Sequence, residues 1–173
     1  MGKRPKTMRI WNVLFIIFVG AVFIQVGCGR VYEDLTNNPK YSFMINKKFR
    51  IKREVMFFKY SSNRKRILMD KMGGGGDLPE KHEMKTKFPF KYGDTKILGV
   101  LPSGSEFKIT KVFHEGSTGM SFIRYMAIIV KSKDQAYNGW EVSPSLLTFQ
   151  TSNMGSPEFD QKYVEEIYTI PLD

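Results

Sequence analysis

The sequence predicts a mainly β domain, a small barrel or sandwich, and three observations lead to this fold class. Residues 48–58 alternate between apolar and charged side chains, which is the period of a half-buried strand. Residues 121–131 are largely apolar on both faces, which is typical of a strand in the middle of a sheet. Turn signals rich in proline, glycine and asparagine, at residues 102–105 and 138–139, separate the predicted strands.

The predicted strands carry two irregularities. Arg53 interrupts the apolar face of residues 48–58, so we expect a bulge or an edge position there. Val112 is out of phase with Phe107 and Ile109, which predicts a second bulge near residues 110–111. The remaining expectations are short strands at residues 67–69 and 97–101, a flexible glycine loop at 73–76 and a hairpin loop at 115–119.

The end of the chain predicts a short helix. Residues 156–158 offer an N-cap serine, a proline at the first helical position and an early acid. Apolar side chains then recur at every fourth residue from Phe159 to Ile167, which favours an amphipathic helix over residues 157–168. A final strand is the alternative, because the apolar residues from Val164 onward also alternate.

The beginning of the chain reads as a membrane-targeting segment. A leader with four cations and no acid precedes an apolar run at residues 10–28. The uninterrupted apolar core, residues 13–24, has the length of a signal-peptide core and is short of the about 20 residues that span a bilayer. We therefore expect residues 1–27 to be a signal peptide, with a retained anchor helix as the alternative.

The apolar run ends on the sole cysteine of the chain. The sequence Val26-Gly27-Cys28-Gly29 resembles a bacterial lipobox, although Gln25 stands where that signal usually has an aliphatic residue. The resemblance implies that Cys28 is lipidated, typically with palmitate, and becomes the first residue of the mature chain. Because Gly29 rather than Asp follows the cysteine, the resemblance implies the periplasm-facing leaflet of the outer membrane; the alternative is an inner-membrane anchor.

Charge is unevenly distributed after the leader. The chain carries a net charge of +10, residues 47–71 hold ten cations against two acids, and the chain after residue 133 is acidic. We assign residues 28–40 to a flexible tether and 41–173 to a single β-rich domain. We expect the basic residues of the 47–71 stretch to form a site for an anionic surface. The expected site residues are Lys48, Arg50, Lys52, Arg64, Lys65 and Arg66. The alternative is a solvated face that only keeps the domain soluble.

Two stretches resemble known families. Residues 101–109, Leu-Pro-Ser-Gly-Ser-Glu-Phe-Lys-Ile, and residues 138–147, which contain Asn-Gly-Trp-Glu-Val, resemble segments of bacterial Src-homology-3-like (SH3-like) domains. That resemblance implies a small barrel that often binds cell-wall peptides. Residues 38–41, 47–58, the glycine loop and 101–109 together look similar to small proteobacterial lipoproteins of uncharacterised function.

Residue types that carry catalysis are sparse. His82 and His114 are far apart in the sequence, and Cys28 is committed to the lipid, so we expect no enzyme, no metal site and no cofactor. The prediction is a non-enzymatic envelope lipoprotein that binds, or has a structural role, at an anionic envelope surface. Its expected partners are peptidoglycan, anionic lipid or a protein, and not nucleic acid, since the chain is exported. The alternatives are an immunity-type protein that blocks a secreted toxin, and an accessory cell-wall enzyme.

Overall fold

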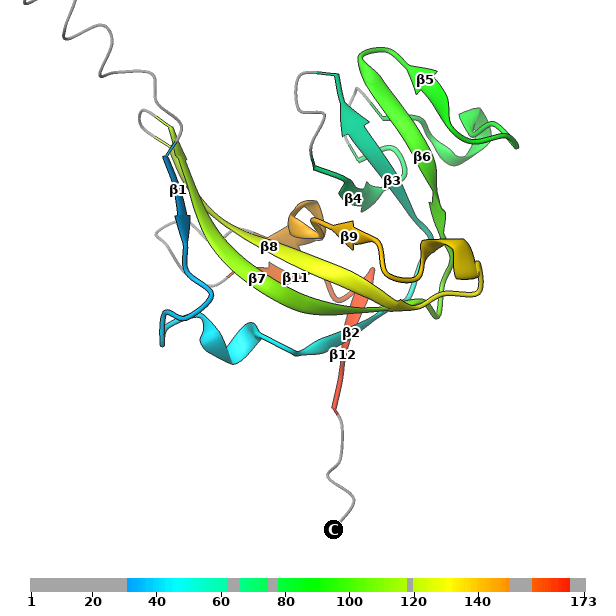
Figure 1. Cartoon of the computed structure of the whole chain (residues 1–173). Coiled ribbons are helices and arrows are strands. Elements are labelled where there is room, and N and C mark those ends of the chain that lie inside the picture. The colour runs from blue at the N-terminus through cyan, green and yellow to red at the C-terminus, as the bar shows by residue number, and fades with distance from the viewer. Residues whose placement is uncertain (1–30, 62–65, 75–77, 118–119, 150–156, 169–173) are drawn as a thin grey trace, which may run out of the picture.

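A computed structural model describes residues 31–61, 66–74, 78–117, 120–149 and 157–168 (Figure 1). The model is 50% strand and 10% helical, and its sheets are not closed, so the predicted mainly β class is confirmed without a closed barrel. The strands are β1 (Val31–Asp34), β2 (Lys48–Ile51), β3 (Val55–Tyr60), β4 (Leu68–Lys71), β5 (Phe90–Tyr92), β6 (Thr95–Leu101), β7 (Glu106–Ser117), β8 (Met120–Lys131), β9 (Glu141–Val142), β10 (Thr148–Phe149), β11 (Glu158–Phe159) and β12 (Val164–Ile167). Single 3₁₀ turns lie at η1 (Ser42–Met44), η2 (Lys81–Glu83), η3 (Gln135–Tyr137) and η4 (Ser145–Leu147).

The long β7–β8 hairpin is the centre of the larger sheet, here called sheet A. Its strand order is β12-β2-β7-β8-β9, and β1 pairs with the far end of β7 beyond β2. The register of β7 against β8 shifts between Ile109 and Lys111, which confirms the bulge predicted there. Figure 1 shows this hairpin curving across the middle of the molecule, with β3 and β6 above it and β2 and β12 below it.

Sheet B, with the strand order β4-β3-β6-β5, lies above sheet A in Figure 1. The chain crosses from one sheet to the other at residues 52–54, between β2 and β3. The single strand predicted over residues 48–58 is therefore two strands, and Arg53 marks the crossing rather than a bulge. β3 is buried on both faces from Val55 to Phe58, because each face of sheet B covers a hydrophobic cluster.

The main hydrophobic core fills the space between the inner faces of the two sheets. Phe57 of sheet B packs against Tyr137 and Trp140, at ring-centroid distances of 5.1 and 5.8 Å. Gly99 lies beneath Tyr137, where an added Cβ would come within 2.2 Å of the phenol oxygen. A smaller cluster, to which Leu78 and Phe90 contribute, covers the other face of β3 and β6.

Three further sequence-based expectations need correction. The helix favoured at 157–168 is not formed, and the alternative of a final strand is confirmed by β12, which follows β11 and a tight turn. Pairing with the free edge of β2 and burial of Val164 outweigh the local helix signals. The assigned tether is ordered from Val31, where β1 pairs with β7 and leads to the buried Leu35. Only one face of β8 is fully buried, since Val130 on the other face is 40% exposed.

Candidate binding surfaces

The basic residues of β2 lie on the water-exposed face of sheet A. Lys48 and Arg50 are exposed and alternate with the buried Phe49 and Ile51, as the sequence pattern predicts. Lys52 follows them and is also exposed. Lys48 and Arg50 therefore share one face of β2, whereas Lys52 lies in the crossing after the strand and lines a groove beside β12.

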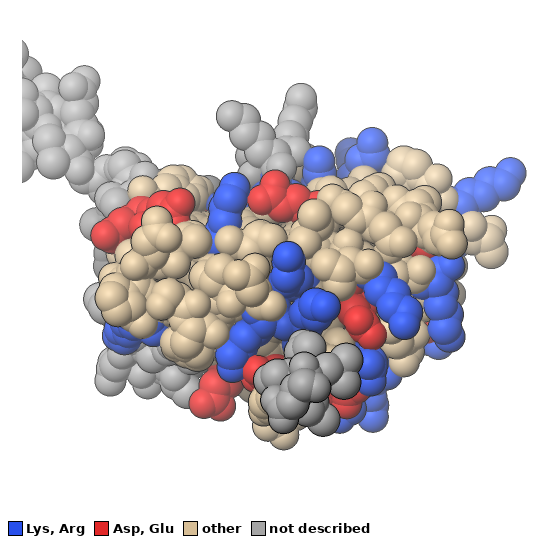
Figure 2. All heavy atoms as spheres, turned by 60° about the horizontal axis from the view of Figure 1, so that its bottom comes forward, with Lys and Arg blue, Asp and Glu red and all other residues tan. Residues whose placement is uncertain are grey.

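Acidic residues of adjacent strands occupy much of this surface. The Arg50 guanidinium lies 3.2 Å from a Glu106 carboxylate oxygen and 3.4 Å from one of Glu165. On the opposite face of β2, where Phe49 and Glu166 are directly opposite each other, Lys47 Nζ lies 2.8 Å from Glu166 of the neighbouring strand β12. Figure 2, which shows the side with β2 and β12, has acidic side chains interspersed among the basic ones. The acidic end of the chain thus folds against its basic stretch, and the charge asymmetry of the sequence is partly neutralised within the fold.

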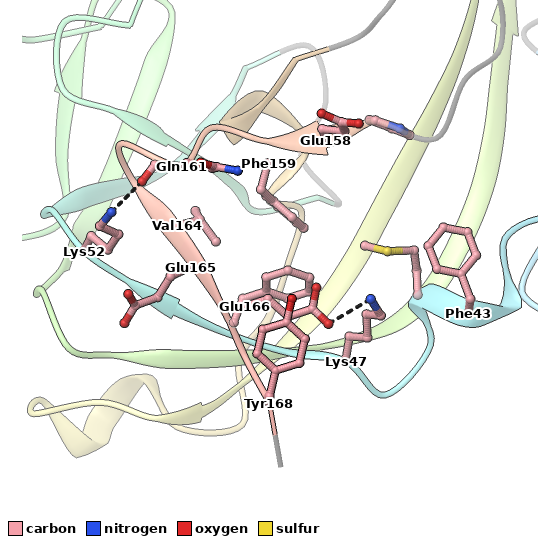
Figure 3. A pocket seen from close by; sticks show the side chains of 13 residues that line it. Phe43, Lys47, Lys52, Glu158, Phe159, Gln161, Val164, Glu165, Glu166 and Tyr168 are labelled. Carbon is pink, nitrogen blue, oxygen red and sulfur yellow. Dashed lines mark hydrogen bonds and ion pairs between the residues drawn. The ribbon is translucent and has the colours of Figure 1, made fainter. Parts of the chain in front are cut away.

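A groove of about 500 Å³ opens between β2, β11, β12 and η1. Its apolar walls include Phe43 and Phe159, and Tyr168, 79% exposed, stands at its rim (Figure 3). The Lys47–Glu166 ion pair crosses one side of it, and Lys52 Nζ donates a hydrogen bond of 2.8 Å to the Gln161 carbonyl oxygen. Because its lysines are partnered in this way, the groove presents apolar surface with few free charges.

Arg66 does not join the basic residues of β2. Its guanidinium lies 4.5 Å from the centre of the Phe113 ring and 3.3 Å from Glu115, toward the far end of β7. Arg124 shares the same carboxylate at 3.5 Å, so Glu115 is flanked by two cations in a half-buried setting. Arg66 is therefore not brought together with Lys48 and Arg50, whereas Arg64, Lys65 and Cys28 lie outside the described residues.

A hollow of about 580 Å³ lies beside Arg66. Tyr32, Phe113 and Met126 supply its apolar surface, and the Lys111–Glu141 pair, 3.7 Å apart, lies at its edge. Its cations have acidic partners, so it has no free positive charge with which to hold an anion.

A serine, a histidine and a carboxylate meet on β1, β7 and β8, which sequence reasoning missed. Ser121 Oγ hydrogen-bonds to His114 Nε2, and His114 Nδ1 lies 3.7 Å from Glu33 Oε2. That last distance exceeds a hydrogen bond, and the Glu33 side chain is 63% exposed, so the carboxylate does not orient the imidazole. The set has the residue types of a hydrolytic triad without its geometry, and we assign it no catalytic role.

A row of three lysines crosses sheet B. Lys59 of β3 lies directly opposite Lys96 of β6, and Lys96 lies directly opposite Lys91 of β5. Directly opposite side chains project from the same face with Cβ atoms about 5 Å apart, and like charges in such pairs are destabilising. None of the three forms an ion pair with another described residue, so the row is a concentrated and uncompensated positive charge. Sequence reasoning missed it because the register that aligns three separate strands has no local signature.

A buried carboxyl lies at the end of β4, beside the glycine loop. Asp70 is 5% exposed, and burial raises the pKa of its carboxyl from 3.8 to about 6. Asp70 Oδ1 accepts a hydrogen bond of 2.7 Å from the Lys71 amide, which opposes part of this rise. Gly74 leaves room for the carboxylate, since an added Cβ would come within 2.7 Å of Oδ2. Asp70 is therefore a titratable group buried within the fold and not part of an open site.

Within the described part of the chain, no group of three His, Cys, Asp or Glu side chains could hold a metal ion. His82 is exposed, and its Nδ1 lies 3.4 Å from Glu80 Oε2.

Comparisons of the chain with protein-family models, with curated proteins and with solved structures find no match. The described residues include no helix long and apolar enough to cross a membrane. The predicted signal or anchor segment at residues 1–27 lies outside them.

Proposed function

We propose that this protein is a non-enzymatic lipoprotein of the bacterial cell envelope, carried on the outer membrane by a lipid on Cys28 and binding at an anionic envelope surface. The observation that carries the proposal is the order of the N-terminal segments: a basic leader, an apolar run, a cysteine preceded by small residues, and then directly a folded domain. The basic charge of the mature chain supports an anionic binding surface.

The start of the fold refines how such a lipoprotein would be held. β1 begins at Val31 and is paired with β7 along its length. The chain between Cys28 and Val31 can reach about 10 Å at most, because an extended residue spans about 3.3–3.6 Å. A lipid on Cys28 would therefore hold the domain against the bilayer surface rather than on a long tether.

The relation to SH3-like domains stays part of the proposal. The two stretches that carry it fall on the end of β6, the turn and β7, and on the segment from η3 to η4. The turn has a positive φ of 85° at Gly104, as such a proline–glycine turn requires. Binding of cell-wall peptides by this domain is a second candidate function, and binding to purified sacculi tests it.

Lipidation is tested by growing cells that express the full chain with radiolabelled palmitate. We expect label in the wild-type protein and none in Cys28→Ala, since the thiol is the acceptor. Sucrose-gradient fractionation should place the wild-type protein with outer-membrane markers. Label that persists in Cys28→Ala would overturn lipidation at this residue, and co-migration with inner-membrane markers would favour the anchor-helix alternative.

The immunity-type alternative makes a different prediction for the same preparation. A protein that blocks a toxin should co-purify in fixed stoichiometry with one secreted protein, through a contact such as the groove beside β12. Retention on anionic envelope material without such a partner supports the binding function proposed here.

A further inference from the structure

We propose that Lys59, Lys91 and Lys96 form a docking row for the anionic phospholipid surface of the membrane that carries the protein. This inference rests on the proposed function, because it concerns the face that a membrane-attached domain turns toward the bilayer. It moves the expected anion-binding surface from β2 to sheet B.

The geometry of the row suits a flat charged surface. Neighbouring strands in a sheet are about 4.8 Å apart, so three directly opposite lysines span about 10 Å across β3, β6 and β5. Lys91 and Lys96 are exposed and Lys59 is half-buried. Three long side chains on one rigid sheet face can meet several headgroups of a flat anionic surface at once.

The charge of the row also favours an anionic partner. On sheet A, Lys48 and Lys108 are directly opposite each other without an ion pair to another described residue, but the nearby Arg50 and Lys47 each face a carboxylate of a neighbouring strand. The sheet B row has no such partner among the described residues, and Asp94, in the adjacent turn, forms no ion pair with it. An arrangement that repels itself within the free protein gains from an external anion, because that anion removes the repulsion.

The strands that carry the row lie on the same side of the molecule as the start of the described chain. In Figure 1 the end of β3, the start of β6 and strand β5 lie at the top, on the same side as the start of β1. The described C-terminal strand β12 points to the opposite side. Since at most about 10 Å of chain separates Cys28 from Val31, a lipid on Cys28 keeps this side of the molecule near the bilayer.

The size of the effect follows from the field of an anionic membrane. A lysine near such a surface contributes about 1 kcal/mol, which is about fivefold in a partition coefficient, so three contribute up to about 100-fold at low salt. The effect is screened within about 8 Å at physiological ionic strength, so it must fall as salt is added.

The test adds the purified full chain to phosphatidylcholine vesicles with and without phosphatidylglycerol, at low and at high salt. Three proteins are compared: wild type, a row variant with Lys59→Gln, Lys91→Gln and Lys96→Gln, and a control variant. The control carries Lys48→Gln, Lys108→Gln and Lys133→Gln, which remove the same charge elsewhere. Lys48 and Lys108 are also directly opposite each other, on sheet A. Thermal unfolding of each variant establishes that it is folded.

We expect the preference for anionic over neutral vesicles to fall at least about tenfold in the row variant at low salt, and to be nearly kept in the control. Lysine acylation read by mass spectrometry should show Lys59, Lys91 and Lys96 protected by anionic vesicles, with Lys48 and Lys108 still reactive. Equal losses in both variants, or protection of Lys48 and Lys108 instead, would overturn the row. Loss of binding to sacculi in the row variant, with vesicle binding unchanged, would also overturn it in favour of a wall polymer.

The same experiment tests the proposed lipoprotein function separately, through a different measurement. The N-terminal segment is common to all three proteins, so its membrane attachment is read from the neutral vesicles and from cell fractionation. A chain that ignores neutral vesicles and stays out of the membrane fraction refutes the lipoprotein proposal. If all three proteins attach to neutral vesicles and bind anionic vesicles equally, the lysine row is refuted and the lipoprotein proposal is not.

Discussion

The Asp70 carboxyl shows how one side chain can set the pH dependence of stability. Its folded pKa is raised to about 6 by burial, so between about pH 4 and 6 the folded protein binds more protons than the unfolded chain. The contribution of Asp70 to the free energy of unfolding is therefore most favourable below pH 4, and it falls as the pH rises toward 6. Above pH 6 the whole cost of burying the charge is present, about 2 kcal/mol after allowance for partial solvation.

Asp70→Asn should remove this cost while keeping an oxygen that accepts the Lys71 amide hydrogen bond. We expect the variant to be about 2 kcal/mol more stable than wild type at pH 8 and nearly equal to it at pH 4, as measured by urea unfolding. Asp94→Asn makes the same chemical change at an exposed position and should show no such pH-dependent gain. A variant that is less stable at pH 8 would show that the charged form of Asp70 is favoured by the fold.

At the scale of the element, β11 and β12 complete the core of sheet A. They are formed by a stretch for which the sequence favoured a helix. The Phe159 ring on β11 lies 4.5 Å from the ring of Phe49, 5.7 Å from that of Phe107 and 5.8 Å from that of Tyr125. These three residues belong to β2, β7 and β8, so one side chain of the tail joins the inner faces of three strands of sheet A.

Phe159→Ala should lower the free energy of unfolding by about 2–4 kcal/mol, since it removes aromatic contacts and leaves a cavity among them. The matched control is Phe149→Ala on β10, the strand that pairs with β11, where the ring is 60% exposed. There the loss should stay within about 0.5 kcal/mol. Equal and small losses in urea unfolding would mean that the tail does not contribute to the core.

At the scale of the whole molecule, the distance between membrane anchor and fold determines what the domain can touch. The proposed lipid on Cys28 is followed within three residues by β1, so the lysine row is held at a high effective concentration near headgroups. Effective concentration falls roughly as the −3/2 power of linker length, so a fourfold longer flexible connection lowers it about eightfold.

A flexible Gly/Ser linker inserted between Gly29 and Arg30, long enough to make the connection from Cys28 to β1 about four times longer, should leave thermal unfolding and membrane fractionation unchanged. We expect the protection of Lys59, Lys91 and Lys96 on anionic vesicles to fall several-fold, as read by acylation of the full chain. Protection that is indifferent to linker length would show that the row binds without help from the anchor.

Much of the fold could be predicted from sequence because many of its signals are local. The alternation at residues 48–51, the bulge at Ile109–Lys111 and the turns at Gly104 and Gly139 each depend on neighbours within a few residues. For the tail the sequence favoured a helix over the strand that forms, because both periods fit a short apolar pattern and only the free edge of β2 decides between them. The candidate surfaces were harder, since the pairing of Arg50 with Glu165 joins residues far apart in the chain.

The sequence by itself determined the mainly β class, the main turns and which face of β2 meets water, because backbone period and turn chemistry are properties of short segments. Tertiary structure alone decided that residues 48–58 divide between two sheets, that β1 belongs to the fold, and that acids of β12 neutralise cations near β2. It also decided which lysines have no ion pair with another described residue. Lys59, Lys91 and Lys96 form a row only through the register of three strands, and register is a long-range property that hydrogen bonding and core packing select together.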